Sequence, residues 1–292
     1  MDRFVFLTVD GLARGAVFAA FALALVIIWR GTRMINFAQG AMAAATTYIA
    51  YSVTSATGSY WYGLVAAVVS GFLLGALVER VLIRRLDQSR PLAAVIVALG
   101  LVMVIHAVLG MVYGNDFRPM QLPFSRDPIR VGEVALLSPY DVFVFAAVGA
   151  VVAGLALLFT RTDIGLKMRA SAFAPDVSRL LGVKVSAMLT LGWALAGAVG
   201  GLAALLIVPT ELGLNPHAVD LVFIFAFTAA VIGGLDSPVG AVIGGLSTGL
   251  LLSFVSGYLS GSIAPIAVLL MLLAVLLLRP QGIFSGVATR QV

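Results

Sequence analysis

The sequence predicts an all-α polytopic membrane protein: a bundle of eight or nine transmembrane helices, some of them broken or re-entrant, with one short cytoplasmic helix. Composition is the first observation behind this prediction. Hydrophobic residues make up 61% of the 292-residue chain and charged residues 11%, whereas soluble domains carry roughly 25% charged residues. Apolar stretches also recur along the chain at about the 20 residues that one bilayer crossing needs. Finally, the basic residues gather in alternate connections.

We expect apolar helices at nine places in one transmembrane domain that covers residues 1–292. The second is short and weakly apolar, and glycines interrupt the chain near 233–240. Such elements are re-entrant or broken only where protein or a water-filled cavity surrounds them. The expected stretches are 12–29, 36–54, 62–83, 91–113, 140–160, 187–208, 220–235, 239–257 and 263–278.

Orientation follows from the basic residues. The connections 30–35, 84–90 and 161–185, with the helix ends beside them and the C-terminal end, hold 13 of the 18 Lys and Arg. The positive-inside rule makes this side cytoplasmic. Nine spans then put the N-terminus outside, whereas eight spans reverse one end. The basic balance therefore indicates topology and contact with anionic lipid, not nucleic-acid binding.

Residues 161–185 form a basic, water-facing loop between two apolar runs. Within it, Val177, Leu180 and Leu181 recur at i, i+3 and i+4, which is typical of a helix with one apolar face. Pro175 suits the first turn of that helix and Gly182 its C-terminal stop. A short amphipathic helix on the cytoplasmic side needs a cover for its apolar face, and a soluble partner subunit supplies one.

Residues 114–138 form the longest loop on the outer side, with three prolines and charges of both signs. The loop is either a solvated connector or part of a docking surface for a soluble solute-delivering protein, which charge complementarity would favour.

The second apolar stretch is unlike its neighbours. It carries Asn36, Gln39, Gly40 and Thr47 among alanines, and small or hydroxyl residues allow close helix packing and interhelical hydrogen bonds. This element therefore belongs in the middle of the bundle, where it either packs or lines a solute path. Asn36 and Gln39 could instead cap a helix end.

Ionisable residues within the expected spans are few. His106, near the middle of the fourth, either bonds a neighbouring helix or contributes to the path. Glu79 lies near a cytoplasmic end beside Arg80 and Arg84, where an ion-pair cluster is expected.

Glycines mark a turn and several close helix contacts. Gly233 and Gly234 end one helix, and Pro238 starts the next after a turn. Three pairs of glycines are spaced four residues apart, as in close-packing GxxxG faces. These pairs are Gly240 and Gly244, Gly245 and Gly249, and Gly197 and Gly201.

Catalytic and metal-binding patterns are missing from the sequence. It has no phosphate-binding GxxxxGK[ST] and no HExxH, and there are no cysteines. The two histidines, His106 and His217, are far apart in sequence. We expect no enzyme activity, no metal and no bound cofactor, so any ATP must be used by another polypeptide.

Four landmarks together resemble the integral-membrane permeases of the branched-chain amino acid ABC importers, whose close relatives carry urea or short amides. Two departures are Ala41, where the family usually has an acidic residue, and Asp236, where it commonly has glycine. The landmarks are Met34–Gly40, Phe227–Gly234 followed by Ser237–Ala241, Arg279–Phe284, and the cytoplasmic Arg169-Ala170, Asp176 and Leu180–Val183.

The resemblance implies a multi-pass permease of the bacterial inner membrane, with a second permease subunit (the same chain or a homologue), two cytoplasmic ATPases and a periplasmic binding protein. It also implies that the 161–185 loop engages the ATPase, through Pro175, Asp176, Val177, Arg179, Leu180, Leu181 and Gly182. The solute remains open among branched-chain amino acids, urea, amides and aromatic acids. An ion-coupled secondary transporter or facilitator is the alternative, although the spans show no chain of buried acids to bind a coupling ion.

Overall fold

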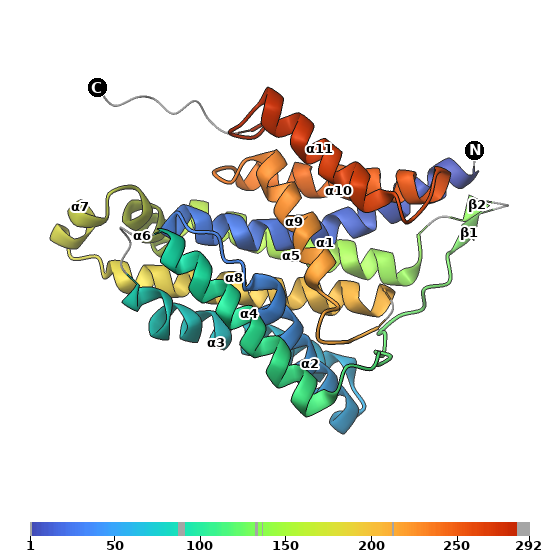
Figure 1. Cartoon of the computed structure of the whole chain (residues 1–292), viewed down its shortest axis with the longest axis horizontal. Helices are drawn as coiled ribbons and strands as arrows, with labels where there is room; N and C mark the ends of the chain where they lie inside the picture. Colours follow the sequence, from blue (N-terminus) through green and yellow to red (C-terminus); the bar gives the residue numbers. More distant parts are fainter. Residues whose placement is uncertain (1, 87–90, 132–133, 136, 212, 285–292) are drawn as a thin grey trace.

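A computed structural model describes residues 2–86, 91–131, 134–135, 137–211 and 213–284. The chain forms an elongated helical bundle, with the small helix α7 at one end and the N-terminus and the β1–β2 ribbon at the other (Figure 1). Arg90 and Arg290 of the basic set, and residues 132–133 and 136 of the outer loop, lie outside the described residues.

Helices occupy all nine expected apolar stretches, and further short elements lie in the connections. In chain order the elements are α1 (Asp2–Thr32), α2 (Gln39–Thr57), α3 (Tyr60–Val81), the 3-10 turn η1 (Ile83–Arg85), α4 (Pro91–Tyr113), β1 (Arg130–Val131), β2 (Val134–Ala135), α5 (Pro139–Arg161), α6 (Asp163–Phe173), α7 (Pro175–Leu180), α8 (Val185–Ile207), η2 (Val208–Thr210), α9 (Asp220–Gly233), α10 (Pro238–Tyr258) and α11 (Ala264–Leu278).

Among the described residues, six helices are long and apolar enough to cross a membrane: α1, α3, α4, α5, α8 and α10. Helices α9 and α11 are apolar but shorter. Helix α2 is outside both groups because alanines and hydroxyl side chains make it less apolar. The protein is thus a helical bundle with six candidate spans, and the count of eight or nine stays a prediction.

Helices α1 and α8 form the centre of the bundle. Every residue from Ala16 to Ile28 is buried, as expected for a helix that is apolar on all sides. Helices α4 and α5 lie at the periphery, where a line of exposed apolar side chains on α4 includes Ile96, Met103 and Val108. This face of α4 is available to lipid or to another subunit.

Glycines allow the central helices to approach closely. A Cβ placed on Gly197 of α8 would lie 2.1 Å from the carbonyl oxygen of Gly71 on α3. Helix α10 uses two faces: a Cβ on Gly244 would lie 2.2 Å from the Ala229 carbonyl of α9, and one on Gly245 would lie 2.4 Å from the Ala19 nitrogen of α1. Backbone-to-backbone packing therefore joins these helices.

Gly201 and Gly249, the later members of two of the expected glycine pairs, also lie at helix contacts. A Cβ on Gly201 of α8 would lie 2.9 Å from the Ala67 carbonyl oxygen of α3 and 2.8 Å from Thr46 Oγ1 of α2. Gly201 therefore lies where α2, α3 and α8 meet, whereas the nearest neighbours of Gly197 are on α3. A Cβ on Gly249 of α10 would lie 2.3 Å from the Gly11 carbonyl oxygen of α1.

The α9–α10 turn has the expected residues at its ends. Gly234 follows α9 with φ +98°, and Pro238 starts α10. The Ser237 hydroxyl caps α10 by accepting a hydrogen bond from the Gly240 amide at 2.9 Å. The two helices pack closely where Gly233 meets Gly240, because a Cβ on either residue would meet the other's carbonyl.

Candidate functional sites

The segment α6–α7 projects from one end of the bundle (Figure 1). Thr162 caps α6 by accepting a hydrogen bond from the Gly165 amide at 3.0 Å. Helix α7 begins at Pro175, and Gly182 follows it with φ +81° while donating to the Arg179 carbonyl at 3.0 Å. Pro175 and Gly182 thus occupy the expected ends, but α6 was not expected as a separate helix.

Helix α7 turns its apolar side chains outward. Leu180 is 88% exposed, Leu181 77% and Val177 56%, and Phe173 at the end of α6 is similarly exposed. The inward side is instead occupied by the buried Ser178. A cluster of large apolar side chains held in water is typical of an interaction surface.

Charged residues surround this apolar cluster. Asp176 pairs with Arg179 at 2.8 Å, and both side chains are largely exposed. Lys167, Arg169 and Lys184 lie in the same part of the chain. We refer to residues 163–182 as the docking segment.

The expected path residues at the start of α2 come together in a buried polar cluster. The Asn36 amide donates to Gln39 Oε1 at 2.8 Å, and Gln39 Nε2 donates to the Ala196 carbonyl of α8 at 2.9 Å. Asn36 Oδ1 also accepts from the Ala38 amide at 3.1 Å, just before α2 begins. The cluster therefore orders the backbone that enters α2 and joins this helix to α8.

The other two α2 candidates are equally enclosed. Thr47 is fully buried and donates to the Ala43 carbonyl within its own helix at 2.8 Å. Gly40 faces Phe223, whose Cβ would lie 2.9 Å from a Cβ on that glycine. A role of these residues in a solute path stays a prediction, because here they contact protein.

Three of the four sequence landmarks meet at one end of α9. Arg33, next to the first landmark, pairs with Asp236. The third landmark returns to the same place: Ile283 donates to the Ile232 carbonyl at 2.9 Å and Phe284 to the Gly233 carbonyl at 3.2 Å. Segments from three distant parts of the chain thus hold the α9–α10 turn, and Asp236 has a partner that glycine would not.

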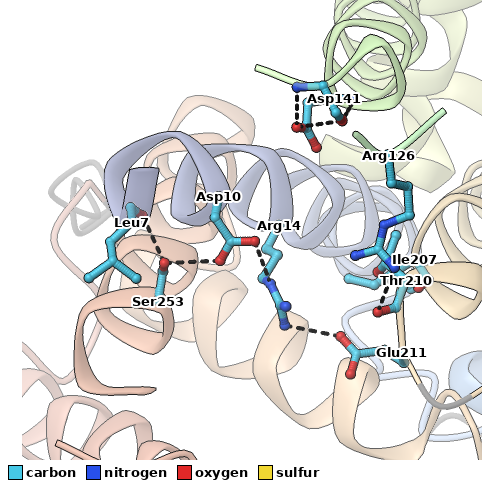
Figure 2. Close-up of polar contacts among 10 residues, drawn as sticks. Leu7, Asp10, Arg14, Arg126, Asp141, Ile207, Thr210, Glu211 and Ser253 are labelled. Carbon is cyan, nitrogen blue, oxygen red and sulfur yellow. Dashed lines mark hydrogen bonds and ion pairs between the residues drawn. The ribbon is translucent and has the colours of Figure 1, made fainter. Parts of the chain in front are cut away.

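A cavity of about 590 Å³ opens at the other end of the bundle, among α1, α10, the start of α11 and the chain after η2. Figure 2 shows its charged wall, in which Arg14 lies between Asp10 at 3.2 Å and Glu211 at 3.1 Å. Ser253 donates to Asp10 at 3.0 Å. Apolar side chains that also line the cavity include Phe18, Leu221, Phe225 and Leu252.

The loop 114–138, expected on the outer side, is anchored beside this cavity. Arg118 and Leu214 exchange two backbone hydrogen bonds, at 2.9 and 2.8 Å. Ser138 and Asp141 form a capping box at the start of α5. The loop is therefore attached to the bundle at both ends, and its proposed docking role stays a prediction.

The fold brings together two histidines that are far apart in sequence. His106 of α4 lies against His217, with ring centroids 4.2 Å apart, and both rings face Asp220 at the start of α9. His217 and Asp220 are three residues apart, but no pattern in the sequence connects them with the distant His106. His106 thus contacts His217 and Asp220, and its contribution to a solute path stays a prediction.

A bundle of closely packed apolar helices, with a charged cavity at one end and an exposed apolar helix at the other, defines a multi-pass membrane transport protein. The chain belongs to the family described as the permease component of the branched-chain amino acid transport system, whose family model matches residues 7–279. The resemblance found in the sequence is thereby confirmed.

Two relatives illustrate the similarity. The high-affinity branched-chain amino acid transport system permease protein LivH of Escherichia coli (strain K12) is 30% identical, over 94% of each chain. The corresponding BraD protein of Pseudomonas aeruginosa is 28% identical, over 95% of this chain and 94% of its own.

A similar fold occurs in a solved structure, PsaBC from Streptococcus pneumoniae in complex with Fab. The TM-score is 0.53 over 93% of this chain and 91% of that chain, at 14% identity. At this identity the likeness concerns the fold alone.

Proposed function

We propose that this chain is the permease subunit of an ATP-driven importer that carries branched-chain or other small amino acids. A periplasmic binding protein delivers the solute, a second permease subunit completes the pore, and two cytoplasmic ATPases bind and hydrolyse ATP. The chain itself is not an enzyme and binds no nucleotide or other organic cofactor. The inner membrane of a bacterium is its expected location.

The observation that carries this proposal is the exposed apolar surface of the docking segment. Leu180 and Leu181 are held in water on a helix fixed by Pro175 and Gly182. Large apolar side chains that become buried in a partner's groove supply most of the binding energy of an interface. An ATPase subunit is the partner that an importer without its own nucleotide site requires.

Charge supports a cytoplasmic position for this end. Basic residues lie at the C-terminal ends of the helices that run toward α6 and α7: Arg30 in α1, Arg84 after α3 and Arg161 in α5. The positive-inside rule favours the cytoplasm for such an end. With nine crossing elements, the N-terminus and the 590 Å³ cavity are then on the outer side.

The outer cavity suits an amino acid. Its polar wall offers the Arg14 guanidinium to a carboxylate and the Asp10 and Glu211 carboxylates to an ammonium group. Its apolar lining can receive an aliphatic side chain. The names of LivH and BraD point to the same class of solute.

Force from the ATPases would reach the bundle through the short connection to α8. The docking segment joins α8 through Val183, whose amide donates to the Ser178 carbonyl at 2.9 Å. Helix α8 in turn contacts α3 through Gly71 and Gly197. Movement of α7 would therefore be transmitted to the central helices, and the pore would open on one side at a time.

A secondary transporter that works alone is the alternative. It would explain the broken helices around α9. It leaves the exposed apolar face of α7 without a partner, which is why we prefer the importer.

Two variants of α7 test the proposal. Leu181→Asp places a charge in the expected groove, and Gly182→Pro is incompatible with φ +81° and removes the hydrogen bond to Arg179. Each should abolish uptake and co-purification of the ATPase while the protein stays in the membrane. Leu181→Met, which keeps an apolar side chain of similar volume at the same position, is the matched control. Normal uptake and co-purification with both α7 variants would refute ATPase docking at this segment.

A further inference from the structure

The outer end of the bundle holds a compact group of metal-binding side chains. One ligand atom from each of His106, His217 and Asp220 lies within 4.8 Å of the other two. The three residues come from α4, from the connection before α9 and from the first position of α9. We call them the His-Asp cluster.

Both imidazole rings lie close to the Asp220 carboxylate. His217 Nδ1 lies 2.9 Å from Asp220 Oδ2, and His106 Nε2 lies 3.4 Å from Asp220 Oδ1. The two rings are inclined at 65°. Three potential ligand atoms therefore lie together in one small volume.

His106 has a buried ring nitrogen without a hydrogen bond. Its side chain is 12% exposed, and Nε2 makes no hydrogen bond with any described residue. Buried polar atoms nearly always have a partner, so an unpaired one calls for an explanation such as an ion. A metal ion would supply the missing interaction for this nitrogen.

The backbone around His217 is held in place. The His217 amide donates to Asn215 Oδ1 at 2.8 Å, and nearby Leu214 is bridged to Arg118. His217 and Asp220 are 62% and 42% exposed, so an ion can reach them from outside. The site thus combines a buried ligand with an accessible side.

We propose that the His-Asp cluster binds a divalent transition-metal ion, with Zn²⁺ as the best match. Two imidazole nitrogens and one carboxylate oxygen are a common zinc donor set that leaves a fourth position for water, whereas Ca²⁺ and Mg²⁺ prefer oxygen ligands. The ion would replace the direct His217–Asp220 hydrogen bond and draw the three ligand atoms closer. It would also tie the peripheral helix α4 to the start of α9.

The composition makes this proposal easy to test. The chain has two histidines and no cysteine, and both histidines are in the cluster. Once any affinity tag is removed, the cluster is therefore the only place where this chain can offer imidazole or thiolate ligands to a metal ion. This proposal does not depend on the solute or on the ATPase partner.

The experiment titrates the purified full-length protein with Zn²⁺ by calorimetry and with Co²⁺ by visible absorption. We expect one bound ion per chain, a Co²⁺ spectrum of nitrogen–oxygen ligation, and a higher melting temperature with Zn²⁺. His217→Ala should weaken Zn²⁺ binding at least about tenfold and remove the thermal shift. Asp116→Asn, an exposed outer-loop acid outside the cluster, should bind Zn²⁺ as the parent protein does.

Two controls keep the result interpretable. His217→Gln retains a polar side chain, and its melting temperature without metal shows whether the fold is intact. Equal Zn²⁺ affinity of the parent protein and both His217 variants would show that the cluster is not a metal site. The same conclusion would follow if the parent protein bound no Zn²⁺ at about 100 μM, which is roughly 100-fold above a micromolar Kd.

Discussion

Gln39 Nε2 donates to the carbonyl oxygen of Ala196 at 2.9 Å, which joins the first turn of α2 to the middle of α8. The side-chain amide of Gln39 occupies the space beside Gly200 of α8. A Cβ on Gly200 would lie 2.3 Å from Gln39 Nε2, so a larger residue there would clash with the amide. A glycine on α8 thus makes room for a side chain that bridges the two helices. This bond adds a polar link to the apolar packing of α2, the least apolar long helix.

Replacement of Gln39 by leucine should destabilise the protein by about 1 to 3 kcal/mol, because Asn36 loses its acceptor and remains buried without one. The loss should appear as a lower melting temperature of the detergent-solubilised protein. Thr47→Val is the matched control, since Thr47 bonds only within its own helix, and it should cost less than about 1 kcal/mol. Equal losses for the two variants would contradict the bridging role of Gln39.

The close contact between α3 and α8 should be intolerant of any side chain at Gly197. Even Gly197→Ala would place a Cβ 2.1 Å from the Gly71 carbonyl oxygen, and overpacking of this kind typically costs about 1 to 3 kcal/mol. Gly154→Ala in α5 is the matched control, because a Cβ there meets nothing within 4 Å. The control should leave stability unchanged or raise it slightly, since alanine favours helix. A normal melting curve for Gly197→Ala would mean that the two helices are farther apart than described.

Glu79 should contribute more to stability than any exposed ion pair. It is 2% exposed and accepts hydrogen bonds from Arg84 at 2.8 and 3.1 Å and from Thr190 at 2.7 Å. Glu79→Gln removes the charge that balances Arg84, and we expect a loss of about 2 kcal/mol, moderated because Arg84 is partly exposed. Asp176→Asn breaks an exposed pair with Arg179 and should change stability by less than about 0.5 kcal/mol. Similar melting temperatures for the two variants would contradict a larger contribution of Glu79 to stability.

The sequence predicts local features of this fold well. Pro175, Gly182, Gly234 and Pro238 lie at helix ends because their backbone preferences act within a few residues and need no tertiary contact. The positions of the nine helices follow from continuous apolar runs for the same reason. Helix α6 was missed because it follows α5 directly, with only Thr162 between them.

Contacts between distant segments were harder to predict from the sequence. The composition of α2 placed it in the middle of the bundle, but nothing in the sequence shows that Gln39 reaches Ala196 rather than a solute. The spacing of Gly197 and Gly201 indicated a close contact but not that the second glycine meets α2 as well as α3. The separation of His106 from His217 argued against a shared site, yet the fold places the connection before α9 against His106 of α4 and brings the two rings together. Such contacts depend on how helices pack, which periodicity along a single helix does not determine.

The return of Ile283 and Phe284 to the last carbonyls of α9 has a consequence for biosynthesis. Because membrane helices are inserted in chain order, α9 and α10 enter the bilayer before the residues that complete their junction have left the ribosome. That junction is therefore closed only after α11 has been made. A ribosome stalled within α11 would therefore hold a nascent protein whose α9 end is still open.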